Sequence, residues 1–137
     1  MQSESILALD VGDKRIGVAV APVGSSFARP LTTLINDNSF WEQLQALLSE
    51  HDAVTIIIGL PRGLNGQETD QTRKVESFVS ELQNRTDVPI RLQDEAVTSV
   101  KAETELQARG KKYEKSDIDA LAATYILEDY LGGVKHV

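Results

Sequence analysis

The chain has 137 residues, and among them are no cysteine and only two histidines, His51 and His136. Without cysteine there is no disulfide framework, no thiolate nucleophile and no Cys-ligated zinc. Two histidines also argue against a His-rich metal site or a His-based catalytic triad. A metal bound by this chain would therefore be held by oxygen ligands, which favour hard cations.

Long hydrophobic runs are absent too, so the sequence predicts no membrane span, and its polar start does not resemble a signal peptide. A soluble cytoplasmic protein is the expectation. Fourteen basic residues face 21 acidic ones, a net charge of −7, which counts against non-specific binding to nucleic acid but leaves a local basic groove open. The apolar content of 41% is ordinary for one globular domain, here residues 1–137.

The hydrophobic pattern predicts an order of three strands, then a helix, a strand, a helix, a strand and two helices. The strands are expected over residues 6–10, 15–21, 27–35, 54–59 and 89–94, and the helices over 40–48, 75–82, 100–106 and 118–126. Pro30 places the third strand at an edge or a bulge. Ser39 and Glu42 fit a capping box, while Gly110 and Gly132-Gly133 are expected to end the last two helices.

This order predicts an α/β fold with one mixed sheet and helices on both faces. The sheet should begin with three antiparallel strands. Right-handed crossovers should then set the strands ending at Asp10, Gly59 and Asp94 parallel to one another. Ligands bind at the carboxyl ends of parallel strands in open α/β sheets, so that edge is the expected site.

Three carboxylates are expected at this edge. Asp10 ends the first strand, Glu95 follows the strand ending at Asp94, and either Asp119 or Asp117 begins the last helix. Carboxylates with no sulfur or imidazole nearby suit one or two Mg²⁺ or Mn²⁺ ions, and such ions support in-line displacement at a phosphodiester.

Each acidic residue also has a purely structural interpretation. One interpretation of Asp10 is that it only begins the turn at Gly12, and one of Glu95 is that it is a solvated residue after a strand. Asp119 could complete a capping box with Ser116, and Asp117 could be the N-cap itself. Spacing alone does not separate these alternatives.

Candidate phosphate contacts lie near the same edge. The loop containing Gly59, Pro61 and Asn65 could present backbone N–H groups to a phosphate, or it could be a plain turn. Basic side chains could line the edge at Lys14, Arg15, Arg62, Arg73 and Lys74, with a further cluster at Arg109, Lys111, Lys112 and Lys115. Trp41 lies on an apolar helical stripe and is expected in the core.

Four segments resemble, in order, the motifs of the YqgF/RuvX family. Residues 7–20 carry Asp10, Gly12, Lys14, Arg15 and Gly17; residues 56–61 are followed by Asn65-Gly66; residues 94–98 are followed by Ala102-Glu103; and residues 119–123 lead to 126–130. The four motifs span nearly the whole chain.

The resemblance implies an RNase H-like fold and a nuclease that depends on Mg²⁺ or Mn²⁺. It implies Asp10, Glu95 and Asp119 as catalytic and metal-binding residues, preferring Asp119 over Asp117. Candidate substrate contacts are Lys14, Arg15, Gly59, Pro61, Asn65 and Thr98. The implied substrate is the 5′ end of pre-16S rRNA, on the small ribosomal subunit, or alternatively a Holliday junction. The protein would be a monomer or a homodimer with no membrane partner.

Two motifs depart from the family pattern. Ala96 and Val97 stand where Arg and Leu are usual, and the second motif reads Arg62-Gly63-Leu64. These departures keep open a third interpretation, a non-catalytic RNA-binding module with a degenerate site.

Overall fold

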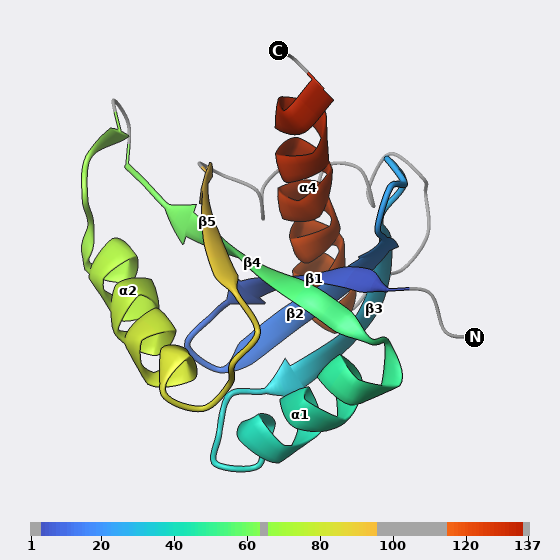
Figure 1. Cartoon of the computed structure of the whole chain (residues 1–137). Coiled ribbons are helices and arrows are strands. Elements are labelled where there is room, and N and C mark those ends of the chain that lie inside the picture. The colour runs from blue at the N-terminus through green and yellow to red at the C-terminus, as the bar shows by residue number, and fades with distance from the viewer. Residues whose placement is uncertain (1–3, 64–65, 96–114, 136–137) are drawn as a thin grey trace.

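The computed structural model describes residues 4–63, 66–95 and 115–135 (Figure 1). Its strands are β1 (Ser5–Val11), β2 (Arg15–Pro22), β3 (Arg29–Ile35), β4 (Ala53–Pro61) and β5 (Ile90–Glu95), and its helices are α1 (Phe40–Glu50), α2 (Asp70–Gln83) and α4 (Lys115–Lys135). The predicted helix over residues 100–106, the predicted contacts Asn65 and Thr98 and the basic residues 109–112 lie outside the described residues.

The strands form one sheet in the order β3-β2-β1-β4-β5. The β1–β2 and β2–β3 pairs are antiparallel, while β1–β4 and β4–β5 are parallel. This confirms the predicted mixed sheet. β3 lies at an edge, and Pro30 lies next to a shift in the register of β3 against β2, as expected for a residue without an N–H to donate.

The two faces of the sheet carry side chains of different size, because successive residues of a strand point to opposite faces. Large apolar side chains such as Leu7, Leu9 and Ile58 pack beneath α1 and α2. Small ones such as Ala8, Ala19 and Ala21 face α4 on the other side. Figure 1 shows α4 crossing the sheet on the side away from α1 and α2, which confirms helices on both faces.

Small residues let α4 come very close to the strands. A Cβ added at Gly17 of β2 would overlap the carbonyl group of Asp119 and lie 2.8 Å from the amide nitrogen of Ala120. A Cβ added at Gly59 of β4 would overlap the end of the Ile126 side chain. Glycine is required at Gly17 because the backbone of α4 occupies the space of a side chain.

One predicted capping box and one predicted helix end were wrong, although Ser39 directly precedes α1 as expected. Ser39 makes no side-chain cap; instead its N–H donates to Asp37 Oδ1 at 2.9 Å. Two hydrogen bonds lower the pKa of Asp37: the larger effect comes from the Ser39 hydroxyl and the smaller from the Ser39 N–H. α4 continues through Gly132-Gly133 to Lys135, since Tyr130 and Leu131 still pack against the core and offset the cost of about 1 kcal/mol that glycine adds to a helix.

Two smaller corrections concern the candidate site. α4 begins at Lys115, so Ser116 and Asp117 lie inside the helix and not at the residue before it. β4 continues to Pro61, so Gly59 is an interior strand residue and not part of a loop. In the described part of the chain, no helix combines the length and the apolar character needed to cross a membrane.

Candidate active site

Asp10 and Asp119 come together on the α4 face of the sheet. Asp10 lies near the carboxyl end of β1 and pairs across the strands with Gly17. Because the Asp119 backbone rests on Gly17, α4 delivers the Asp119 carboxylate to the neighbourhood of Asp10. Repulsion from the Asp119 carboxylate helps to raise the pKa of Asp10, so the two carboxylates are close enough to interact electrostatically.

The carboxyl group of Asp10 resists ionisation. Burial, with a smaller contribution from repulsion by Asp119, raises the pKa of Asp10 from 3.8 to about 7. Burial dominates because a carboxylate that loses its water pays a desolvation penalty that the neutral acid does not. Such an acid binds a cation well, since a nearby positive charge relieves both causes of the shift.

Arg15, the first residue of β2, is the ion-pair partner of Asp119. Its Nε lies 2.7 Å from Asp119 Oδ2, although the two residues are 104 positions apart in the sequence. Their side chains are 32% and 20% exposed. A charge-assisted hydrogen bond this short fixes the orientation of the Asp119 carboxylate beside Asp10.

Arg15→Ala is therefore expected to lower the free energy of unfolding by about 1–3 kcal/mol in metal-free buffer, because it leaves the Asp119 carboxylate without this hydrogen bond. Urea unfolding followed by the fluorescence of Trp41, the single tryptophan, measures the loss. Arg73→Ala is the matched control, since Arg73 pairs with Asp70 on the exposed surface of α2, where such pairs contribute about 0.5 kcal/mol or less. Equal effects of the two changes would contradict a special role for Arg15.

Glu95 is the last residue of β5, in register with Pro61 of β4. Its Oε1 atom is buried, and its carbonyl oxygen accepts a hydrogen bond from the Arg62 N–H at 3.0 Å. Among the described residues there is no group of three acidic or histidine side chains arranged to hold a metal ion. The structure thus brings together Asp10 and Asp119, and Glu95 does not join them in a three-ligand cluster.

The donor set itself fits a hard divalent cation. Asp10 and Asp119 supply carboxylate oxygens that repel each other, and Mg²⁺ is commonly bound through one or two carboxylates with water completing its coordination. Glu95 lies at the carboxyl end of a parallel strand, on the same sheet edge as Asp10.

Three side chains hold the turn after Asp10 in place, and of these the sequence indicated only Lys74. Asn36 Nδ2 donates to the Gly12 carbonyl at 2.8 Å, and Gln71 Nε2 donates to the Val11 carbonyl at 3.3 Å. Lys74 of α2 lies 3.3 Å from Asp13. The sequence placed Gly17 in the first motif but did not show that it makes room for α4 opposite Asp10.

The remaining predicted contacts lie as follows. Lys14 is exposed in the β1–β2 turn, while Gly59 is buried beneath α4. Pro61 accepts a hydrogen bond from the buried Thr72 hydroxyl through its carbonyl oxygen, which ties the end of β4 to α2. Packing against Ile126 of α4 therefore accounts for the glycine at position 59 without the predicted substrate contact.

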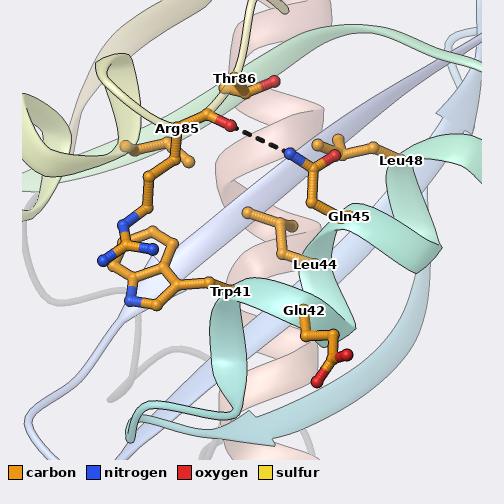
Figure 2. A pocket seen from close by; sticks show the side chains of 8 residues that line it. Trp41, Glu42, Leu44, Gln45, Leu48, Arg85 and Thr86 are labelled. Carbon is orange, nitrogen blue, oxygen red and sulfur yellow. Dashed lines mark hydrogen bonds between the residues drawn. The ribbon is translucent and has the colours of Figure 1, made fainter.

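A pocket of about 240 Å³ lies elsewhere, between α1 and α2 (Figure 2). Leu44, Leu48 and Leu82 form its apolar wall. Trp41 packs against the core but stays partly exposed, stacking on Phe78, with the Arg85 guanidinium 4.4 Å from its ring centre. No predicted site residue lines this pocket.

Comparisons with known proteins agree with this arrangement. A family model described as RuvX, Holliday junction resolvase, matches residues 4–133. A protein named "Putative pre-16S rRNA nuclease" from Sulfurihydrogenibium sp. (strain YO3AOP1) is 41% identical over 128 residues, covering 92% of this chain and 88% of that protein. A protein of the same name from Crocosphaera subtropica is 42% identical over 136 residues, covering 96% and 94%.

Solved structures show the same fold at low sequence identity. Thermus thermophilus RuvC in complex with a Holliday junction substrate aligns with a TM-score of 0.57 at 16% identity, covering 97% of this chain and 96% of that one. The fowlpox virus Holliday junction resolvase aligns with a TM-score of 0.54 at 11% identity, covering 95% and 99%. These similarities confirm the RNase H-like, RuvC-type fold.

Proposed function

Because this chain belongs to the RuvX family, we propose that it is a divalent-metal-dependent nuclease that hydrolyses a phosphodiester bond in a ribosomal RNA precursor. The observation that carries the proposal is the meeting of Asp10 and Asp119 at the sheet edge, with burial and mutual repulsion raising the pKa of Asp10 to about 7. Acids whose pKa is raised by burial and by a neighbouring acid cluster at functional sites, which supports a catalytic role for this pair.

In this proposal Asp10 and Asp119 hold Mg²⁺ or Mn²⁺, and Glu95 contributes from the end of β5. The bound ion supplies Lewis-acid activation of water and neutralises charge on the phosphate. Arg15 keeps the Asp119 carboxylate oriented throughout. Lys14, exposed in the adjoining turn, is available to a phosphate of the substrate.

The RNA substrate is proposed from the names of the curated relatives, and the small ribosomal subunit would present it. The family description favours a second candidate, the resolution of four-way DNA junctions. A junction has two-fold symmetry, so paired cuts require two sites and a homodimer, whereas RNA processing is compatible with a monomer.

Cleavage of end-labelled RNA tests the function directly. The 5′ leader of pre-16S rRNA and a four-way DNA junction are incubated in parallel with Mn²⁺ or with EDTA. We expect the RNA to be cut only with Mn²⁺, and Asp10→Asn and Glu95→Gln to reduce the rate at least about 100-fold, since mispositioned or missing charge at the reacting centre costs that much.

Each alternative outcome has its own meaning. Cutting of the junction alone supports the resolvase. If neither substrate is cut, and the affinity for RNA is the same with Mn²⁺ or EDTA and in both variants, the chain is a non-catalytic binding module. Cleavage retained by Asp10→Asn contradicts the assignment of the site.

A further inference from the structure

We propose that Arg62 is a phosphate-binding residue, held by Asp94 at the same sheet edge as the site until the backbone of a nucleic acid takes the place of that carboxylate. This inference rests on the proposed function and adds to it a residue that recognises the substrate.

The backbone of Arg62 is fixed at the carboxyl ends of two parallel strands. Arg62 directly follows β4, and its N–H donates to the Glu95 carbonyl at 3.0 Å, which extends the β4–β5 pairing beyond Pro61 and Glu95. Its guanidinium is therefore anchored next to the end of β5. The sequence after Glu95 carries no other basic residue before Lys101.

The ion pairs of Arg62 are loose. Its Nε lies 3.3 Å from Asp94 Oδ1, and its Nη1 lies 3.9 Å from Glu68 Oε1. The partner side chains are 70% and 53% exposed, whereas that of Arg62 is only 28% exposed. Exposed pairs at these distances contribute little, so the guanidinium is preoriented without being committed to its present partners.

Phosphate is the better ligand for this guanidinium. A phosphodiester offers two oxygens that accept parallel N–H donors, and such bidentate bonds are shorter and stronger than a single long contact with an exposed carboxylate. Three other arginines are paired differently: Arg73 pairs with Asp70 within α2, Arg85 pairs with Glu81 in the last turn of α2, and Arg15 pairs with Asp119.

Charge supports the same conclusion. Asp10, Asp94 and Glu95 all lie at this edge, and together they repel a polyanion. Arg62 is a positive charge at the ends of β4 and β5 and opposes that repulsion there. Removing Asp94 should therefore strengthen binding, while removing Arg62 should weaken it.

Binding of the labelled RNA leader and of the DNA junction, measured in an Asp10→Asn background that does not cut, tests the proposal. We expect Arg62→Ala to raise Kd about 5- to 20-fold and to reduce the slope of log Kd against log salt by about 1, as for one lost phosphate contact. Arg62→Lys should fall between, since it keeps the charge without the bidentate geometry. Asp94→Asn should lower Kd about 2- to 5-fold.

Matched controls remove the same charges elsewhere. Arg29→Ala acts on β3, at the opposite edge of the sheet, and Asp87→Asn acts in the connection that leads into β5. Each should change Kd less than about 2-fold, because charges beyond a Debye length are screened. The gain from Asp94→Asn should also disappear when Arg62 is alanine, since both changes act on one contact.

The proposal is overturned if Arg62→Ala raises Kd no more than Arg29→Ala does. It is equally overturned if Asp94→Asn lowers Kd no more than Asp87→Asn does. Should Arg62→Ala fail to fold, Asp94→Asn and Arg62→Lys decide the matter by the same comparison. If the parent chain cuts neither substrate while the Arg62 effects on binding hold, the nuclease function fails and the binding role of Arg62 stands. Cutting by the parent with no Arg62 effect rejects this inference alone.

Discussion

Asp10→Asn should abolish cleavage and at the same time stabilise the folded chain at neutral and alkaline pH. The unfolded chain loses the Asp10 proton near pH 3.8, whereas burial and Asp119 hold the folded pKa at about 7. Between these values the folded state binds one proton more than the unfolded state. The free energy of unfolding therefore falls as pH rises, by about 1.4 kcal/mol per pH unit.

Asparagine has nearly the same shape and does not ionise, so the variant escapes this loss. The gap in stability between Asp10→Asn and the parent should widen by roughly 2–3 kcal/mol between pH 5 and pH 8. This is an upper value, since Asp10 keeps some exposure to solvent. Urea unfolding at the two pH values, followed by Trp41 fluorescence, measures the gap.

Asp13→Asn is the matched control for this experiment. Asp13 lies in the turn that follows Asp10 and β1, is exposed and pairs with Lys74 at 3.3 Å. Asp13→Asn removes one carboxylate, as Asp10→Asn does, and should lower the free energy of unfolding by no more than about 1 kcal/mol at either pH. A gap between Asp10→Asn and the parent that stays constant from pH 5 to pH 8 would show that Asp10 ionises as freely in the folded chain as in the unfolded one.

Mn²⁺ provides a second readout that does not depend on cleavage. A cation that binds the ionised acids stabilises the folded parent by mass action. At pH 8 we expect Mn²⁺ to raise the urea midpoint of the parent and to leave that of Asp10→Asn nearly unchanged. An equal rise in both proteins would place the ion elsewhere on the chain.

Gly17→Ala should be among the most destabilising single changes to this protein. The added methyl group would overlap the carbonyl of Asp119 and lie 2.8 Å from the Ala120 nitrogen. These are backbone atoms of a helix, so no side-chain rotation relieves the overlap and α4 has to move away from the sheet. We expect a loss of about 3 kcal/mol or more in the free energy of unfolding.

The folded fraction of Gly17→Ala should also lose metal response, because a displaced α4 carries Asp119 away from Asp10. Gly132→Ala makes the same chemical change within α4, where a Cβ meets nothing within 4 Å. It should stabilise the helix by up to about 1 kcal/mol. Urea unfolding with and without Mn²⁺ compares the two, and a Gly17→Ala protein as stable as the parent would contradict the close approach of α4.

The sequence by itself determined the frame of the protein. Buried apolar runs and helical periodicity predicted the described strands and helices in their order, and the right-handed crossover rule predicted which strands are parallel. The absence of cysteine limited any metal to oxygen ligands, and the positions of Asp10 and Glu95 at strand ends placed both acids at one edge. These features depend on local pattern and chain connectivity, which a sequence contains.

Only the tertiary structure decided how the acids behave. The pKa of Asp10, the pairing of Arg15 with Asp119 and the contact of α4 with Gly17 depend on distances between segments remote in the sequence. The same is true of the two details that were wrong: Ser39 bonds to Asp37 and not to the backbone of α1, and core packing continues α4 through two glycines. Local propensity amounts to about 1 kcal/mol per residue, and packing against the sheet outweighs it.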